Sequence, residues 1–295
     1  MVAGARPPAL LLAGALVATG CGGGDERPPA AAARAPSTPF AYDSGAPLRL
    51  VVHARRGLVR EVSYASPRAG RVRALLVVPR GRGPFPAVVY LHGAGGTRRQ
   101  LLSDATALAR RGVAGLLLDS AWVRAGPGTA GGLAAVRRFR DLEAATVVEA
   151  RRGIDLLRRL PAIDGGRIGF VGWSAGARQG ALLAGVERRL RAIVLVAGGA
   201  APVSAYTAQA PPALRGELGR LLGTVDPLRW IRRARPGTLL FQNGRRDEVV
   251  PRDALARLAA AAPAPHRVRW YDAGHRPTPR MVRERDAWLL VRLAR

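Results

Sequence analysis

The segment from residue 167 to 179, R-I-G-F-V-G-W-S-A-G-A-R-Q, constrains this chain more than any other. A short apolar run suited to a strand leads into G-W-S-A-G, and an Ala- and Leu-rich stretch suited to a helix follows. A serine hydroxyl is a poor nucleophile at its normal pKa, so a catalytic serine has to be exposed beside a base. A tight strand-to-helix turn presents Ser174 in this way, and Gly172 and Gly176 leave the space for it. The segment therefore predicts a nucleophile at Ser174.

An incidental serine in a glycine-rich turn is the alternative interpretation of this motif. The chain has 36 glycines in 295 residues, so a G-x-S-x-G arrangement can arise from composition alone. The strand pattern before the turn and the helix pattern after it favour the nucleophile, because a catalytic elbow needs both.

The first twenty residues have the pattern of a signal peptide. Arg6 precedes an apolar run of about ten residues, which is too short to span a bilayer. The run ends in V-A-T-G-C, which resembles a bacterial lipobox, in which the cysteine is lipidated and becomes the new N-terminus. Cys21 is the only cysteine, so we expect no internal disulfide. We expect export and a lipid anchor at Cys21. The alternative is an ordinary cleaved signal peptide followed by an unrelated cysteine.

The rest of the chain divides into a linker and one domain. Residues 21–47 are rich in Ala, Pro, Ser and Gly, which predicts a flexible linker. Residues 48–295 are enough for one hydrophobic core, so we expect a single domain. Within it, residues 198–235 lack a strand pattern and contain four prolines. This predicts a small insertion of short helices, sufficient for a small lid.

The formal net charge is +27, and all 47 basic residues are arginine. Nucleic-acid binding is one interpretation of such a charge. However, the arginines are spread along the chain, aromatic residues make up only 5%, and no basic patch with interleaved aromatics occurs. Arg, Ala, Gly and Pro also share GC-rich codons, so a biased genome explains this composition. We therefore expect no specific nucleic-acid partner, while attraction to an anionic envelope surface stays open.

The order of expected strands and helices indicates an α/β fold. Three Val- and Leu-rich runs predict an antiparallel lead-in sheet, at residues 48–52, 59–63 and 72–78. Six apolar runs then suit strands buried on both faces, at residues 87–91, 113–118, 168–171, 192–196, 238–242 and 268–271. Helix patterns lie between them, at residues 97–111, 133–160, 253–262 and 281–293 and after the elbow, with Thr97 as the expected cap of the first. This alternation predicts a mostly parallel central sheet with helices on both faces.

Ser174, Asp247 and His275 each follow a predicted strand, in that order along the chain. In an open parallel sheet the site forms at the carboxyl ends of the strands, so these side chains should meet. His275 would take the proton of Ser174 and later give it to the leaving group. Asp247 would hold the imidazole in the required tautomer and stabilise its charged form. These residue types in this pattern point to acyl transfer.

Other assignments for the acid and the base stay open. Asp272 lies three residues before His275 and is the main rival of Asp247. The alternative for His275 is a surface histidine in a glycine-containing loop. The chain has only four histidines, and this one follows a strand directly. We expect Asp226 and Asp253 to start helices instead.

The stretch H-G-A-G-G at residues 92–96 follows a predicted buried strand. The tetrahedral intermediate of acyl transfer carries negative charge on oxygen, which two preorganised backbone N–H groups can stabilise. We expect these from Ala175, directly after the nucleophile, and from Ala94 in this loop. His92 is expected to be structural. A dinucleotide or phosphate site is not indicated, because the chain has neither G-x-G-x-x-G after a strand nor G-K-S/T.

With these motifs the chain resembles the α/β-hydrolase superfamily. It is most similar to its dienelactone-hydrolase-like, acetyl-xylan-esterase-like and prolyl-oligopeptidase-like group. The resemblance covers residues 71–295 and is carried, in order, by H-G-A-G-G, G-W-S-A-G, N-G-R-R-D-E-V-V-P and A-G-H. Dienelactone hydrolases have a cysteine where this chain has Ser174. No propeller domain precedes the catalytic region, so the size selection of oligopeptidases is not implied.

These observations predict an exported serine hydrolase that cleaves carboxylic esters through an acyl-enzyme, with no metal or organic cofactor. The substrate would be a small or polymer-linked ester, and the membrane contact would be the lipid at Cys21. Trp122, Trp173 and the insertion are expected around the pocket. The alternatives are a serine peptidase or thioesterase with the same triad, because the triad alone does not select the leaving group. A non-catalytic protein that binds an anionic envelope polymer is a third interpretation.

Overall fold

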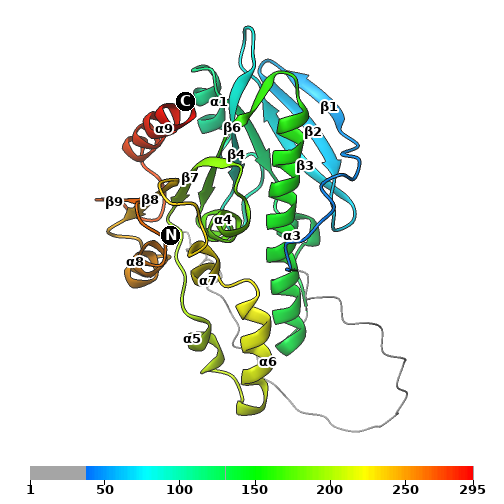
Figure 1. Cartoon of the computed structure of the whole chain (residues 1–295). Coiled ribbons are helices and arrows are strands. Elements are labelled where there is room, and N and C mark those ends of the chain that lie inside the picture. Colours follow the sequence, from blue (N-terminus) through cyan, green and yellow to red (C-terminus); the bar gives the residue numbers. More distant parts are fainter. Residues whose placement is uncertain (1–37, 130, 295) are drawn as a thin grey trace, which may run out of the picture.

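The structure is a computed structural model that describes residues 38–129 and 131–294. The predicted signal peptide, Cys21 and the linker as far as residue 37 lie outside these described residues. Within the described residues, nine strands form one sheet in the order β1-β2-β3-β5-β4-β6-β7-β8-β9 (Figure 1).

The first three strands form the antiparallel part of this sheet. They are β1 (Val51–Arg56), β2 (Val59–Ala65) and β3 (Arg71–Val77). β3 continues the antiparallel pairing onto β5 (Ala114–Leu118). The predicted antiparallel lead-in is therefore confirmed, although β1 begins three residues later than expected.

All pairs from β5 to β9 along the sheet are parallel. The remaining strands are β4 (Phe85–Leu91), β6 (Ile163–Trp173), β7 (Leu190–Val196), β8 (Leu239–Gly244) and β9 (Arg267–Tyr271). The predicted mostly parallel sheet is confirmed. Because their carboxyl ends share one edge, the loops after β4, β6, β8 and β9 meet there.

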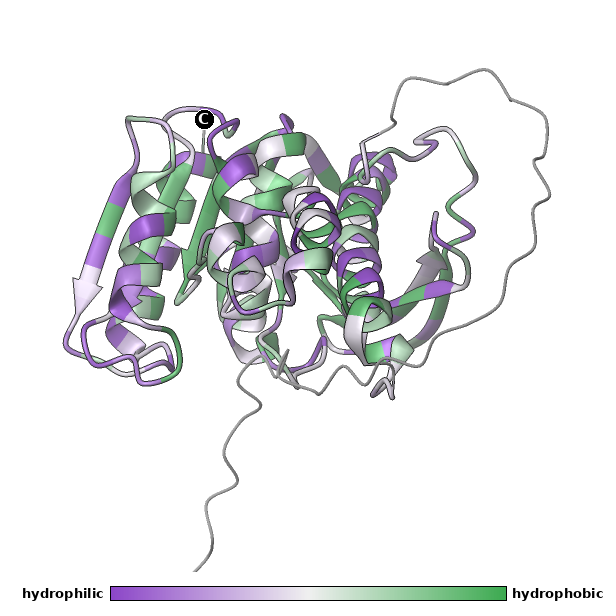
Figure 2. Ribbon diagram, turned by 90° about the horizontal axis from the view of Figure 1, so that it is seen from below, coloured by the Kyte–Doolittle hydropathy of each residue, from purple (hydrophilic) through white to green (hydrophobic). Residues whose placement is uncertain are grey.

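Helices cover both faces of the sheet, as predicted. α1 (Leu102–Ala109) and α9 (Pro279–Leu293) pack on one face. α3 (Gly132–Arg159), α4 (Ala175–Val186) and α8 (Arg252–Ala260) pack on the other (Figure 1). Figure 2 shows that the strands between these helices are mostly hydrophobic, whereas the helices mix both kinds of residue.

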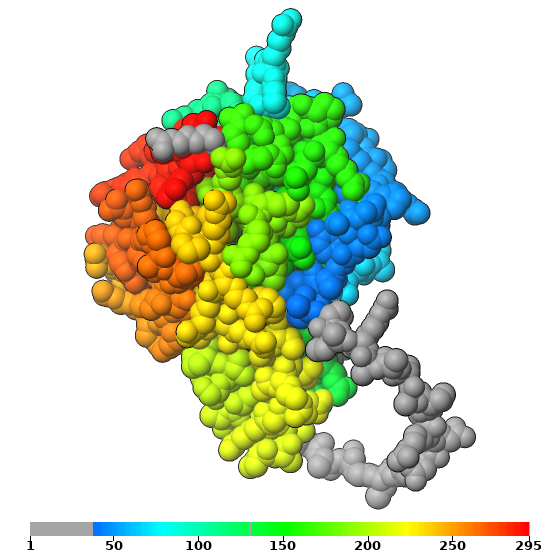
Figure 3. Space-filling view, in the orientation of Figure 1, coloured from blue at the N-terminus to red at the C-terminus, as the bar shows by residue number. Residues whose placement is uncertain are grey.

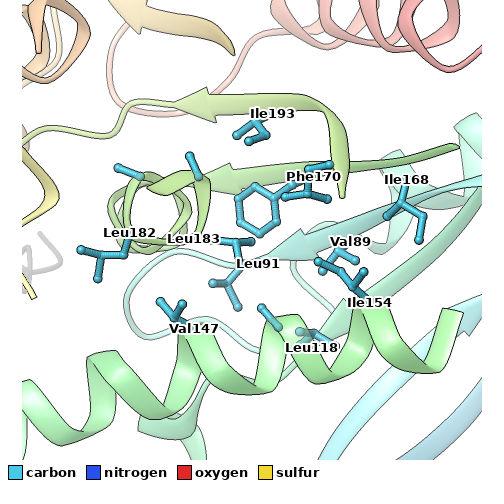
Figure 4. Close-up of a cluster of buried hydrophobic side chains, with 14 of the residues drawn as sticks. Val89, Leu91, Leu118, Val147, Ile154, Ile168, Phe170, Leu182, Leu183 and Ile193 are labelled. Carbon is cyan, nitrogen blue, oxygen red and sulfur yellow. The ribbon is translucent and has the colours of Figure 1, made fainter. Parts of the chain in front are cut away.

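Alternate residues of β4 pack into the hydrophobic cores on the two faces of the sheet. Val89 packs with α3 and α4 on one face, and Val88 and Tyr90 pack with α1 on the other. Successive side chains of a strand point to opposite faces, so a strand covered on both sides has to be apolar throughout. Figure 4 shows the larger core, where Val147 of α3 and Leu182 of α4 lie close to β4 and β6.

The structure corrects the first predicted helix. α1 begins at Leu102 rather than at residue 97, and its N-cap residue is Leu101, without a side-chain cap. The hydroxyl of Thr97 instead accepts a hydrogen bond from the Arg99 N–H at 3.3 Å. The predicted cap at Thr97 is therefore wrong. Such a short local bond is an alternative to capping that sequence patterns do not distinguish.

The insertion consists of three short helices, α5 (Val203–Thr207), α6 (Pro212–Gly223) and α7 (Pro227–Ile231). α5 and α6 project from the body of the molecule as a separate lobe (Figures 1 and 3). Asp226 caps α7 by accepting the Leu228 N–H at 2.9 Å, which matches the predicted helix start.

Residues 38–47, the end of the predicted flexible linker, are packed on the domain. Phe40 is 0% exposed and meets the ring of Trp230 edge-on, with 5.0 Å between the centroids. The buried Arg152 donates to the carbonyl of Ser44 at 2.9 Å and to that of Ala46. The structure thus holds this end of the predicted linker on the domain at Phe40, Ser44 and Ala46. One buried aromatic ring and paired carbonyl groups outweigh the Ala- and Pro-rich composition.

No helix within residues 38–129 and 131–294 is both long enough and apolar enough to cross a membrane.

Candidate active site

Ser174 occupies a sharp turn between β6 and α4. Its φ is +55°, in a region that residues with a side chain rarely adopt. A methyl group on Gly172 would lie 2.3 Å from the carbonyl oxygen of Gly176, and one on Gly176 would lie 2.3 Å from that of Leu91. Both glycines are therefore required by close backbone approach. The turn holds the Ser174 hydroxyl at the carboxyl edge of the sheet.

His275 lies in the loop after β9, and its ring reaches the serine. The distance from His275 Nε2 to Ser174 Oγ is 2.9 Å, although 101 residues separate them. The indole N–H of Trp173 donates to the carbonyl oxygen of His275 at 3.1 Å, which holds the histidine loop against the elbow.

Asp247, in the loop after β8, lies on the other side of the imidazole. Its Oδ2 and Oδ1 are 2.9 and 3.1 Å from His275 Nδ1. The N–H groups of Val249 and Val250 donate to Oδ1 at 2.9 and 2.8 Å, and the side chain is only 1% exposed. These bonds fix the carboxylate so that His275 carries its proton on Nδ1 and leaves Nε2 free to accept.

The rival carboxylate, Asp272, is not part of this series. It is 76% exposed and pairs with Arg246 at 3.1 Å. The structure therefore brings Ser174, His275 and Asp247 together and leaves Asp272 in solvent.

The two predicted oxyanion donors lie in the expected loops. Ala175 is the first residue of α4, so its N–H has no acceptor within the helix. Ala94 is the second residue of a turn closed by the Gly96 N–H and the Gly93 carbonyl at 3.1 Å. Gly93 runs close to the nucleophile, since a methyl group on it would lie 3.4 Å from Ser174 Cβ. The role of Ala94 and Ala175 as donors stays a prediction.

His92 and Gln100 hold this turn in place through hydrogen bonds to Gly93. The Ser120 N–H donates to His92 Nε2 at 3.1 Å, so Nδ1 carries the proton and donates to the Gly93 carbonyl at 2.7 Å. Burial lowers the pKa of His92, which keeps the ring neutral. Gln100 Oε1 accepts the Gly93 N–H at 2.8 Å. Gln100 was not predicted, because it falls within the helix expected at residues 97–111, where a polar residue suits the exposed face.

A buried carboxylate behind the elbow is a second feature that the sequence analysis missed. Glu143 of α3 is 0% exposed and accepts from the Trp122 indole at 2.9 Å and the Gln179 amide at 2.8 Å. Arg178 lies 2.8 Å from its other oxygen. Glu143 lies four positions after Phe139 and four before Val147 on the apolar stripe of the helix, and this spacing could have revealed it.

One cavity is lined by the insertion, as predicted, but not by the two tryptophans. A small cavity of about 60 Å³ lies beside Arg178, between α3, α4 and the insertion. Its lining includes Phe139, Tyr206 and Leu222 but neither Trp122 nor Trp173. Both tryptophans instead donate hydrogen bonds that support the elbow, as described above.

The described part of the chain contains no group of three or more His, Cys, Asp or Glu side chains that could hold a metal ion.

Solved structures with the same architecture include an acetyl xylan esterase from Paenibacillus sp. R4. It matches with a TM-score of 0.70 at 19% identity, over 84% of this chain and 90% of that one. A puromycin-hydrolyzing peptidase of Mycobacterium tuberculosis matches with a TM-score of 0.61 at 20% identity, over 80% and 40%. The chain has the α/β-hydrolase fold. The fold expected from the predicted resemblance to that superfamily is confirmed.

Sequence comparison adds a second group of relatives. The profile of the family described as BAAT / Acyl-CoA thioester hydrolase C terminal matches residues 151–215. Acyl-coenzyme A thioesterase 2, mitochondrial, of Mus musculus is 32% identical over 165 residues, which cover 55% of this chain and 32% of the relative. The peroxisomal succinyl-coenzyme A thioesterase of Mus musculus is 32% identical over 162 residues, covering 54% and 34%. The matched part thus spans about a third of the length of these relatives.

Proposed function

We propose that this chain is a serine hydrolase that cleaves carboxylic esters or thioesters through an acyl-enzyme. The observation that carries the proposal is the hydrogen-bonded series from Ser174 through His275 to Asp247, with 2.9 Å at each contact. The similarity to esterase structures and to acyl-coenzyme A thioesterase sequences supports the same reaction class.

Acylation begins at Ser174 Oγ. His275 Nε2 takes the hydroxyl proton as the oxygen attacks the carbonyl carbon of the substrate. Asp247 stabilises the imidazolium that forms, and the N–H groups of Ala175 and Ala94 stabilise the oxyanion. The intermediate collapses when the bond from the carbonyl carbon to the leaving oxygen or sulfur breaks, and His275 gives its proton to that leaving atom while Ser174 Oγ keeps the acyl group.

Deacylation repeats these steps with water. His275 takes a proton from a water molecule, whose oxygen attacks the acyl carbon, and then protonates Ser174 Oγ as the acid product leaves. In both halves of this cycle, His275 accepts and then gives every proton that moves.

Esters and thioesters share this chemistry, so the leaving group decides between two candidate activities. The expectation from the sequence is a carboxylic ester. The acyl-coenzyme A thioesterase relatives favour a thioester, although the matched part covers only about a third of their length.

The test compares p-nitrophenyl acetate, butyrate and octanoate with acetyl- and succinyl-coenzyme A as substrates of the purified protein. We expect turnover of at least one class, and a loss of about 10³-fold or more in Ser174→Ala. Ser103→Ala, at an exposed serine of α1, serves as the matched control and should match the parent. Equal rates in the parent and Ser174→Ala would remove Ser174 from the reaction.

We also propose that the protein is exported and anchored through a lipid on Cys21, on the extracytoplasmic side of a bacterial membrane. The support is the signal-like pattern of residues 1–21. The protein should sediment with membranes, and Cys21→Ala should move it to the soluble fraction. A parent protein that stays in the cytoplasm with residues 1–20 attached would contradict this.

A further inference from the structure

A long groove lies between β9 and α9, on the edge of the sheet farthest from β1. Its volume is about 1340 Å³. In Figure 1, β9 lies at the left edge, with α9 above it and α8 below. α9 packs mainly over β6 and β7, and it reaches β8 and β9 only through bonds such as those from Gln242 to Met281 and from Tyr271 to Glu284. The groove is therefore a consequence of where α9 crosses the sheet.

Arginines dominate the charge of this groove. Arg267 and Arg269 lie two residues apart on β9 and therefore face the same side of the sheet, and both line the groove. Neither of them, nor Arg235 in the turn before β8, forms a salt bridge within the described residues. The two carboxylates of the lining, Asp272 and Glu284, are already paired with arginines at 3.1 and 2.8 Å. The groove thus keeps an excess of positive charge.

The floor of the groove holds polar atoms without partners. Gln242 is 1% exposed and uses its amide N–H groups on Tyr271 and Met281, at 2.8 and 2.9 Å. Its Oε1, and the indole N–H of Trp288, have no hydrogen-bond partner within the described part of the chain. An unsatisfied buried polar group costs about 1–3 kcal/mol. One acceptor and one donor among the side chains that line the groove are thus left without a partner, and both atoms are closed to solvent in this structure.

The groove reaches the two ends of the loop that carries His275. Its lining includes Asp272 and Thr278, which lie three residues before and three residues after His275. A chain lying along β9 would therefore lead to the loop that carries the proposed base.

We propose that this groove binds the sugar chain of an acidic polysaccharide, and that the site deacylates O-acyl esters on that chain. The proposal rests on the proposed function. Guanidinium groups bind carboxylates with paired, charge-assisted hydrogen bonds, which suits a uronic acid polymer. Nucleic acid fits less well, because base stacking needs free aromatic faces. Arg252 lies over the Trp270 ring, and Arg292 over the ring of the buried Trp288.

The first experiment measures binding without turnover. Full-length Ser174→Ala is titrated with a fluorescent oligogalacturonate at two salt concentrations, and also with a neutral xylo-oligosaccharide and a DNA single strand of equal charge. Arg267→Gln/Arg269→Gln is the test variant. Arg55→Gln/Arg56→Gln, on exposed positions of β1 at the opposite edge, removes the same charge and is the matched control.

We expect oligogalacturonate to bind, with an affinity that falls with salt, and the xylo-oligosaccharide not to bind. The β9 variant should weaken binding about tenfold and the β1 variant should not, since two charge-assisted contacts are lost only in the first. No binding, an equal effect of both variants, or groove-dependent binding of DNA as tight as that of oligogalacturonate would each overturn the proposal.

The second experiment measures hydrolysis of acetylated polygalacturonate by the parent and the β9 variant. We expect KM to rise about tenfold while kcat and the hydrolysis of p-nitrophenyl acetate stay unchanged, because only chain binding is affected. An unchanged KM would overturn the link between groove and site. Groove-dependent binding with no hydrolysis of any ester would overturn the proposed function and leave the groove as a polysaccharide site.

Discussion

Nδ1 of His275 lies 2.9 Å from Oδ2 of Asp247, while Asp272, far nearer in sequence, points into solvent. The loop after β8 brings Asp247 to the histidine, and two backbone N–H groups hold its carboxylate in place. This relationship decides which carboxylate can orient the imidazole.

Replacing Asp247 should therefore affect turnover far more than replacing Asp272. Asp247→Asn removes the acceptor that sets the histidine tautomer, so we expect kcat to fall about 10³- to 10⁴-fold. Asp272→Asn is the matched control and should stay near the parent rate. Steady-state kinetics on p-nitrophenyl esters measure both, and comparable losses would contradict the assignment.

Glu143 should contribute to stability mainly through its buried contacts. Glu143→Gln leaves Arg178 without its charged partner, and breaking a buried pair costs about 3–5 kcal/mol. The control is Glu217→Gln, whose pair with Arg137 is more exposed and should cost less than about 1 kcal/mol. Urea unfolding measures the free energy of unfolding of both variants. A small decrease in Glu143→Gln would show that solvent reaches the side chains around Glu143.

The buried His92 should make the folded state sensitive to acid. Burial lowers the pKa of His92 in the folded protein below its unfolded value, so its neutral form contributes stability above the unfolded pKa of about 6.5. That contribution is lost as pH falls through the folded pKa, because the unfolded chain takes up the proton first. In thermal melts between pH 8 and pH 5, the melting temperature of His92→Gln should fall less with acid than that of the parent. This variant keeps an acceptor for the Ser120 N–H. His53→Gln is the control, and parallel curves for parent and His92→Gln would refute the effect.

Phe40 should anchor the segment before β1. Phe40→Ala removes a fully buried ring from its contact with Trp230, which should cost about 3–5 kcal/mol. Val51→Ala, at a residue that is 42% exposed, should change the free energy of unfolding by about 0.5 kcal/mol or less. If Phe40→Ala behaved like this control, the packing of residues 38–47 would add nothing to the domain.

Local patterns in the sequence determined the sheet, the elbow and the order of the candidate triad. Continuous apolar runs predict strands covered on both faces, and G-W-S-A-G predicts a turn that admits only glycine at two positions. These features depend on residues close together in the chain, so periodicity and spacing are enough to find them.

Contacts between distant segments were decided only by the tertiary structure. It selected Asp247 over Asp272, buried Phe40 against Trp230, brought Trp122 and Gln179 to Glu143 and placed Arg235 beside Arg267 in one groove. Each of these contacts joins residues far apart in the chain. Which carboxylate is buried, and which arginine keeps its charge unpaired, therefore depends on how the sheet and its helices pack.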